Sequence, residues 1–153
     1  MCGIFSFFGT QYNEKELLGY FNKIQHRGPD NSQFLKINES IYFGFHRLRI
    51  NGLDESSNQP FTINNKILIC NGEIFNFEDL KKKYNLEEKY KSNSDCEVII
   101  HLYEEFGIEK TCELLDGEFS FILFDKNVNK VFIGRDQLGI RPLFIGKHEK
   151  EFI

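Results

Sequence analysis

The sequence predicts an α+β protein in which β-sheets are covered by helices. Segments with strand patterns stand at both ends of the 153 residues, and segments with helical spacing stand between them. This order is typical of α+β layering. The length fits one domain, and a hydrophobic content of 41%, with 15% aromatic residues, is enough for a packed core.

The first third of the chain predicts one helix among three strands. Residues 3–9 are apolar at nearly every position, which predicts a strand buried on both faces. Residues 14–25 carry apolar side chains at helical spacing, and the Gly-Pro content of residues 26–30 predicts the turn that follows. Two further strands are expected at residues 32–37 and 41–50.

The middle of the chain predicts a strand followed by helices. The strand at residues 66–70 is expected to end at Asn71-Gly72, a dipeptide that favours positive φ and a sharp change of direction. Helices are then expected at residues 77–84, 95–106 and 108–115.

The last part predicts two hairpins. Residues 119–125 and 130–134 alternate around a polar turn, which is typical of a hairpin. Residues 143–145 and 152–153 have the pattern of a second hairpin, and the last strand stops without a polar tail. We therefore expect a shortened form or a fragment of a longer protein, incomplete at its C-terminal end.

Charge and hydropathy exclude several classes of protein. The net charge is −4 and no basic stripe is present, which argues against nucleic acid as a partner. No apolar segment is long enough to span a membrane, and the N-terminus lacks a signal-peptide pattern. We expect a cytoplasmic protein.

The four cysteines are scattered and form no CxxC pair, so the sequence predicts neither a metal site nor a redox motif. Reduced thiols in a reducing compartment are expected. Cys70 and Cys112 lie beside apolar residues and are predicted to be small core side chains.

Cys2 follows the initiator methionine, and removal of Met1 would leave it with a free α-amine beside its thiol. An α-amine titrates at about pH 7.7 to 8.0, near the optimum for a general base. N-terminal nucleophiles are activated in this way. The competing interpretation is an ordinary cysteine placed there by chance.

Arg47 belongs to an expected strand that places it on the same face as Phe43 and Phe45, so its guanidinium needs a partner. A ligand carboxylate would suit its planar donors. An internal salt bridge to an acidic residue is the favoured alternative. His46, on the other face, is a candidate base, although a structural histidine is the simpler interpretation.

Two further groups have candidate roles. The Asn71 amide and the Gly72 N–H could converge on one oxygen as an oxyanion hole, although an ordinary turn is the simpler alternative. Ser94 and Glu97 match a capping box at the start of a helix. Asp95 between them could meet a ligand's ammonium group, or it could simply favour the helix dipole.

Together these groups resemble the class II glutamine amidotransferases. Ordered motifs carry the resemblance over nearly the whole chain, and they are MCGI (1–4), HRGPD (26–30), GFHRL (44–48), NGEIFN (71–76), SDCE (94–97), LDGEFSF (115–121) and GRDQLGIRPL (134–143). HRGPD, the NGEIxN motif and SDCE are most similar to the glutamine-dependent asparagine synthetases.

The resemblance implies a four-layer αββα sandwich of two antiparallel sheets between helical layers. It also implies that residues 1–153 are a glutaminase domain that releases ammonia from L-glutamine without a cofactor. The implied catalytic residues are Cys2 as nucleophile, with its amine as base, and Asn71 with Gly72 as oxyanion hole. The implied glutamine-binding residues are these two together with Arg47, Leu48, Arg49, Ile50, Asn51, Glu73 and Asp95.

In the full-length family protein the ammonia goes to an ATP- and magnesium-dependent synthetase domain in cis, which makes asparagine. That domain is absent from these residues. A homodimer is compatible with the sequence. One departure concerns the pocket's outer wall, because residues 49–52 read Arg-Ile-Asn-Gly where the family commonly has a small residue, an apolar pair and an aspartate.

Three alternative functions stay open. The domain could belong to another class II enzyme of the amidophosphoribosyltransferase type. It could be a relative that binds glutamine without turnover. It could also be a thiol protease in which Cys2 works with His26 or His46.

Overall fold

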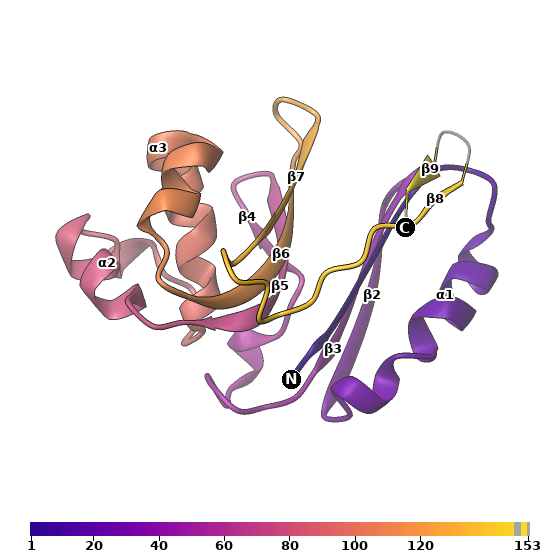
Figure 1. Ribbon diagram of the computed structural model, residues 1–153, viewed down its shortest axis with the longest axis horizontal. Helices are drawn as coiled ribbons and strands as arrows, with labels where there is room; N and C mark the ends of the chain where they lie inside the picture. Colours follow the sequence, from indigo (N-terminus) through magenta and orange to yellow (C-terminus); the bar gives the residue numbers. More distant parts are fainter. Residues whose placement is uncertain (149–150, 153) are drawn as a thin grey trace.

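The described residues form two antiparallel sheets and three α-helices, which confirms the predicted α+β class (Figure 1). The structure is a computed structural model that describes residues 1–148 and 151–152. The first sheet has the strand order β2-β3-β1-β9-β8 and the second has the order β4-β5-β6-β7. The strands are β1 (Gly3–Phe8), β2 (Asn31–Asn38), β3 (Ile41–Arg47), β4 (Phe61–Ile63), β5 (Lys66–Ile74), β6 (Gly117–Asp125), β7 (Lys130–Arg135), β8 (Lys147–His148) and β9 (Glu151–Phe152), and the α-helices are α1 (Glu14–Asn22), α2 (Phe77–Lys83) and α3 (Val98–Leu114).

Helix α1 covers the outer face of the first sheet. It begins at a capping box in which Asn13 and Glu16 bond each other's backbone N–H. Leu17 of α1 packs with side chains of β1 and β3. A Cβ at Gly44 would lie 2.6 Å from the Phe21 ring, so β3 needs a glycine where this ring rests on it.

The two sheets share an apolar cluster whose members alternate with a period of two. Phe43 and Phe45 of β3 meet Ile67 and Ile69 of β5 in this cluster, together with Ile122 and Phe124 of β6. Alternation of this kind is expected where one face of each sheet is buried against the other. The facing sides of β3, β5 and β6 therefore form the apolar centre of the molecule.

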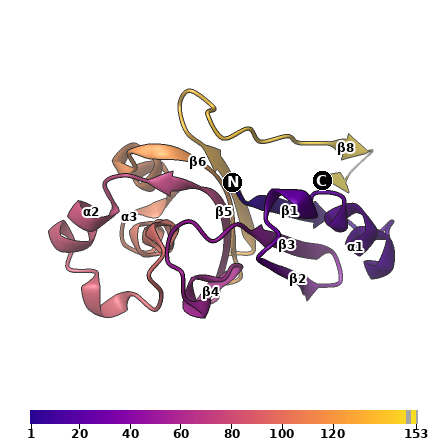
Figure 2. The same cartoon turned by 90° about the horizontal axis from the view of Figure 1, so that it is seen from below.

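The intervening residues of β5 and β6 point to the other face of the second sheet. There Leu68, Phe121 and Leu123 join a larger cluster with Ile99 and Leu102 of α3. Figure 1 places α2 and α3 beyond the second sheet and α1 beyond the first, and the turned view in Figure 2 agrees.

Several predicted boundaries need correction. Strand β5 continues to Ile74, so Asn71-Gly72 is not a turn, because both residues pair with β6. Strand β3 ends at Arg47 rather than residue 50, and β4 was not predicted. The predicted break between two helices is present at Gly107, which has φ 77° inside α3.

Two predictions near the C-terminus and in α3 were wrong. Residues 143–145 are not a strand, and the hairpin there is formed by β8 and β9 instead. Residue 153 lies outside the described residues. Cys112 is exposed, whereas Cys70 is buried in the core as predicted. In the described part of the chain, each helix is too short or too polar to traverse a bilayer.

Candidate active site

A cavity of about 190 Å³ collects nearly all the predicted site residues. Its walls come from the start of β1, the end of β3 with the loop after it, the middle of β5, and the segment before α3. Arg49 is the one predicted residue outside the lining; its side chain is exposed. The predicted residues that line the cavity are Cys2, Arg47, Leu48, Ile50, Asn51, Asn71, Gly72, Glu73 and Asp95.

Cys2 is held at the cavity by backbone groups. The Leu48 N–H donates to its Sγ at 3.4 Å, and the thiol faces the Leu48 carbonyl oxygen at 3.7 Å. Burial raises the pKa of the Cys2 thiol above its ordinary value, although the Leu48 contact and the nearby N-terminal amine oppose that rise. With Met1 in place the thiol is therefore protonated at neutral pH.

The HRGPD segment supports Cys2 and the end of β3, a role that sequence reasoning did not assign to it. Arg27 Nε donates to the Cys2 carbonyl oxygen at 3.2 Å. A Cβ at Gly28 would lie 2.2 Å from the His46 carbonyl oxygen, so the backbones touch there. Asp30 accepts from the Arg49 N–H at 2.8 Å and fixes the chain next to Leu48.

Asn71 and Gly72 reach the cavity from within β5. Asn71 is 5% exposed, and its side-chain amide makes no hydrogen bond within residues 1–148 and 151–152. Gly72 has no positive φ, but an added Cβ would lie 2.4 Å from the Glu118 carbonyl oxygen. Close approach to β6, rather than turn geometry, therefore requires glycine here.

Arg47 is 3% exposed and donates to the loop that follows it. Its Nη1 donates to the Asp54 carbonyl oxygen at 2.8 Å and to Asn58 Oδ1 at 2.6 Å. Its Nη2 donates to the carbonyl oxygens of Asn51 and Gly52. Burial lowers the pKa of this guanidinium without neutralising it. Three backbone carbonyls and the Asn58 side chain thus take the place of the predicted internal salt bridge, and no ion pair of Arg47 occurs in the part of the chain that is described.

Asp95 is 3% exposed and lies beside the cavity at the start of a short 3-10 helix (Asp95–Glu97). Its Oδ2 accepts from the Ile74 N–H at 2.6 Å. Burial raises the pKa of Asp95 above its ordinary value, the Ile74 contact opposes the rise, and the charge of Glu73 adds to it. A cationic ligand group would stabilise the ionised carboxylates of Asp95 and Glu73.

The predicted capping box at Ser94 and Glu97 is only half present. Ser94 Oγ accepts from the Cys96 N–H at 3.3 Å. Glu97 does not return to Ser94; it accepts from the Lys91 N–H at 2.7 Å and pairs with His101 at 3.0 Å. Glu97 therefore anchors the loop that leads to Asp95.

Two loops beside the cavity are joined by a contact that the sequence did not predict. Asn93 Nδ2 donates to Asp54 Oδ2 at 2.7 Å, across 39 residues of sequence. The other carboxylate oxygen of Asp54 accepts from the Ser57 N–H at 3.2 Å. Since Asp54 also accepts from Arg47 through its carbonyl, this contact ties the wall near Asp95 to the wall near Arg47.

His46 has a structural role. Its Nδ1 lies 2.7 Å from Ser32 Oγ and its Nε2 lies 3.1 Å from the Phe21 carbonyl oxygen, while its ring stacks on Phe21 at 3.7 Å. Burial lowers its pKa. Both hydrogen-bond partners of Cys2 Sγ are backbone atoms of Leu48, so the geometry gives no support to a thiol protease pair with His46.

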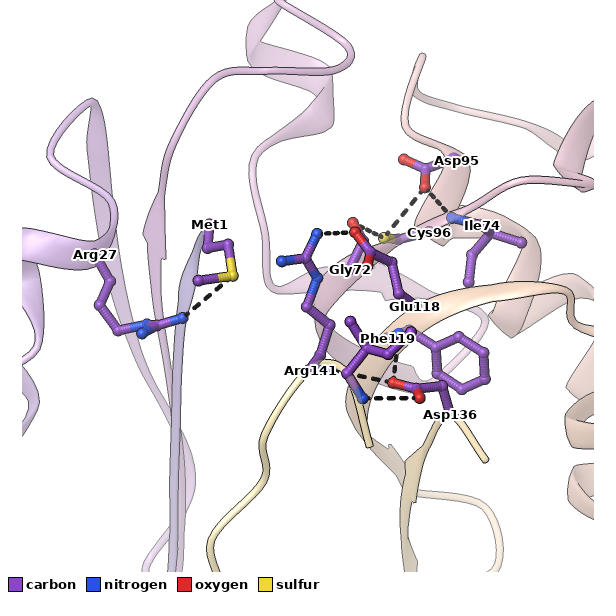
Figure 3. Close-up of polar contacts among 11 residues, drawn as sticks. Met1, Arg27, Gly72, Ile74, Asp95, Cys96, Glu118, Phe119, Asp136 and Arg141 are labelled. Carbon is purple, nitrogen blue, oxygen red and sulfur yellow. Dashed lines mark hydrogen bonds and ion pairs between the residues drawn. The ribbon is translucent and has the colours of Figure 1, made fainter. Parts of the chain in front are cut away.

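A loop after β7 closes the cavity from the second sheet. Asp136 accepts backbone N–H groups of Phe119, Ile140 and Arg141 at distances from 2.9 to 3.2 Å. These contacts place Arg141 in the cavity wall, where its guanidinium pairs with Glu118 (Figure 3). Sequence reasoning included this loop in a motif but gave Arg141 no role.

No cluster of three or more His, Cys, Asp or Glu side chains within the described ranges is arranged to hold a metal ion. The cavity lining offers three thiols, serine hydroxyls, amide and N–H donors, two arginines and two carboxylates.

The chain is similar to a known domain family and to part of longer proteins of one name. A family model described as glutamine amidotransferase domain matches residues 1–153. The chain is 42% identical to asparagine synthetase [glutamine-hydrolyzing] of Mus musculus over 159 aligned residues, which cover 100% of this chain and 28% of that protein. A protein of the same name from Gallus gallus is 42% identical over 94% of this chain and 26% of its own length.

A more distant relative is the probable asparagine synthetase [glutamine-hydrolyzing] of Acanthamoeba polyphaga mimivirus. It is 37% identical over 95% of this chain and 28% of its own length. The chain thus spans about 28% of the length of the curated relatives it matches.

Proposed function

This chain belongs to the class II glutamine amidotransferase family, and on that premise we propose that it hydrolyses the side-chain amide of L-glutamine to glutamate and ammonia. The observation that supports the proposal most is the cavity that gathers Cys2, Asn71, Gly72 and Asp95. A thiol, two N–H donors and a carboxylate are what an enzyme needs to attack an amide and hold an α-amino group.

The reaction begins with the amine that Met1 removal exposes. This amine takes the Cys2 thiol proton, directly or through a water, and the thiolate attacks the amide carbon of glutamine. The oxyanion that forms accepts hydrogen bonds from the Asn71 amide and the Gly72 N–H. Collapse expels ammonia with the proton, and water then hydrolyses the glutamyl thioester to glutamate and restores the thiol.

The head group of glutamine meets opposite charges at the two walls. Asp95 and Glu73 orient its ammonium group, which lessens the cost of the buried Asp95 charge. Arg47 faces the carboxylate with its remaining donor, Nε–H, because the hydrogens of its two terminal nitrogens are used by the loop. Leu48, Ile50 and Asn51 complete this wall.

The fold proposed for the domain is the four-layer αββα sandwich of the family. Three apolar clusters support it, since one lies between the sheets and the others lie between each sheet and its helices.

In a longer protein, the ammonia would serve an ATP- and magnesium-dependent ligase domain that converts aspartate to asparagine. The names of the relatives support this part, and the glutaminase step itself uses no cofactor. We place the protein in the cytoplasm because its cysteines are free thiols. Neither nucleic acid nor a membrane is a proposed partner, and a homodimer is compatible with the proposal.

Glutamate release from glutamine by protein that lacks Met1 tests the proposal. Cys2→Ala should abolish release, and Asn71→Ala should lower kcat by about 10² to 10³ with a smaller change in KM, because one oxyanion donor is lost. Release by Cys2→Ala above background, or unchanged turnover by Asn71→Ala, would contradict the assigned roles.

A further inference from the structure

Two arginines line the candidate cavity, one from each sheet, and the proposed reaction has used only one of them. Arg47 comes from the end of β3 in the first sheet, and Arg141 comes from the loop after β7 in the second. Figure 3 shows Arg141 extended between the Met1 side of the cavity and the strand that carries Gly72.

Arg47 alone is poorly placed to bind a carboxylate through two parallel hydrogen bonds. Both of its terminal nitrogens donate to the loop of residues 51–58, and one of the acceptors is the side chain of Asn58. Bidentate binding needs two neighbouring N–H groups of one guanidinium. Arg47 keeps Nε–H, which gives a carboxylate a single hydrogen bond.

The guanidinium of Arg141 has N–H donors that lack a partner within the described part of the chain, and hydrogen bonds fix the Arg141 backbone. Asp136 accepts its N–H at 3.2 Å and the N–H of Ile140 at 2.9 Å, and Gly139 supplies the positive φ of 66° that the turn needs. In the side chain, Nη2 pairs with Glu118. Its Nε is buried and has no hydrogen-bond partner among the described residues.

A buried N–H of a charged group without a partner is uncommon in folded proteins and calls for an explanation. A ligand carboxylate in the cavity would supply the missing acceptor once a small movement of the Arg141 side chain uncovers Nε. It would also balance the charge of a guanidinium whose present partner, Glu118, is partly exposed to solvent.

We propose that Arg141 is a second carboxylate-binding residue, which holds the α-carboxylate of glutamine together with Arg47. The proposal rests on the glutaminase function and adds a substrate contact to it. Glu118 keeps the guanidinium at the cavity in the free protein and competes with the substrate carboxylate for it. The two arginines thus meet the carboxylate, while Asp95 and Glu73 meet the ammonium group.

The test compares glutamine with 4-aminobutanamide, which keeps the amine and the amide but has no carboxylate. Arg141→Gln should raise KM for glutamine on the order of 10- to 100-fold with little change in kcat, as expected for loss of a charged hydrogen bond made before and during reaction. Its kcat/KM for 4-aminobutanamide should stay within about twofold of the unsubstituted value.

Two more variants make the test specific. Glu118→Gln removes the competitor and should lower KM for glutamine without changing kcat/KM for 4-aminobutanamide. Arg135→Gln is the matched control, because Arg135 is an exposed arginine of β7 outside the cavity. This variant should leave kcat/KM unchanged for both substrates. A fall in kcat/KM of Arg141→Gln that is equal for both substrates would overturn the proposal.

Binding measured without turnover separates this proposal from the glutaminase function. In a Cys2→Ser background, calorimetric titration with glutamine should show a dissociation constant raised on the order of 10- to 100-fold by Arg141→Gln. Equal affinity would overturn the role of Arg141. Tight binding without hydrolysis in the unsubstituted protein would contradict only the glutaminase function. If Arg141→Gln does not fold, a KM for glutamine that is unchanged or raised in Glu118→Gln overturns the proposal.

Discussion

Asp95 and Asp136 are both buried beside the second sheet, but their carboxylates are satisfied to different degrees. Asp136 accepts three backbone N–H groups, and although burial alone would raise its pKa, those contacts bring the pKa below its ordinary value. Asp95 accepts from the Ile74 N–H, and burial leaves its pKa above the ordinary value. The surroundings of Asp136 therefore stabilise its ionised form, whereas the surroundings of Asp95 destabilise its ionised form.

This difference is the one we expect between a structural carboxylate and a carboxylate that is proposed to bind a ligand. The carboxylate oxygens of Asp136 accept hydrogen bonds from the loop that carries Arg141, so Asp136 fixes the backbone of that loop. Asp95 lies beside the cavity with Cys2 and has acceptor capacity left for a cation. Perturbed carboxylates of this second kind gather at functional sites.

The largest expected effect comes from Asp136→Ala, which leaves one buried and two partly buried backbone N–H groups without their acceptor. The free energy of unfolding should fall by about 3 to 5 kcal/mol, because hydrogen bonds to a charged group are strong and three of them are lost at once. Urea denaturation measures the change. Asp79→Ala, at an exposed aspartate of α2, is the control and should cost less than about 1 kcal/mol. A loss as small as that of the control would show that Asp136 does not hold the loop.

The next effect comes from Asp95→Asn, which keeps an oxygen acceptor for Ile74 and removes the charge. KM for glutamine should rise by about 10- to 100-fold, because a charged hydrogen bond to the ammonium group is lost. The free energy of unfolding without substrate should be unchanged or slightly higher, since a buried charge is gone. Steady-state kinetics and urea denaturation together decide the point, and an unchanged KM would remove Asp95 from the binding site.

The smallest effect is the pH dependence of stability, which should have opposite signs for the two residues. The folded pKa of Asp136 is lowered, so its stabilisation is present above the unfolded value of about 3.9 and is lost as pH falls through the lower folded value. The folded pKa of Asp95 is raised, so the protein gains stability as pH falls through that raised value towards about 3.9.

Unfolding free energies of the unsubstituted protein, Asp136→Asn and Asp95→Asn, measured from about pH 3 to pH 7, isolate each contribution. As pH falls, the difference in unfolding free energy by which the unsubstituted protein exceeds Asp136→Asn should shrink. The unfolding free energy of the unsubstituted protein should rise relative to that of Asp95→Asn. Parallel curves for all three proteins would contradict the contrast between the two carboxylates.

Much of the fold was predictable because burial imposes simple periods. Alternation around a polar turn predicted the hairpin of β6 and β7, and the division of one helical stretch into residues 95–106 and 108–115 predicted the break at Gly107 in α3. Asn71-Gly72 was mispredicted because local turn preference was outweighed by pairing with β6, which lies far along the chain. Cys112 was mispredicted because its apolar sequence neighbours were used to predict burial, whereas its side chain is exposed on α3.

The membership of the site was largely predictable, but its contacts were not. Residue types pointed to Cys2, Arg47, Asn71, Gly72 and Asp95, and the resemblance to the amidotransferases implied the other predicted residues that line the cavity. Three features depend on backbone positions that are distant in the sequence. They are the loop carbonyls that bind Arg47, the contact between Asn93 and Asp54, and the Nε–H of Arg141 that lacks an acceptor among the described residues. No local pattern carries that information.

The proposed reaction requires Cys2, once freed of Met1, to be the nucleophile for glutamine. Intact-mass and peptide analysis after treatment with 6-diazo-5-oxo-L-norleucine, a glutamine-like diazoketone, tests it most directly. We expect protein without Met1 that carries a single adduct at Cys2, and we expect glutamine to suppress this adduct and Cys2→Ala to prevent it. Efficient glutamine hydrolysis by protein that retains Met1, or an adduct at any residue other than Cys2, would contradict it.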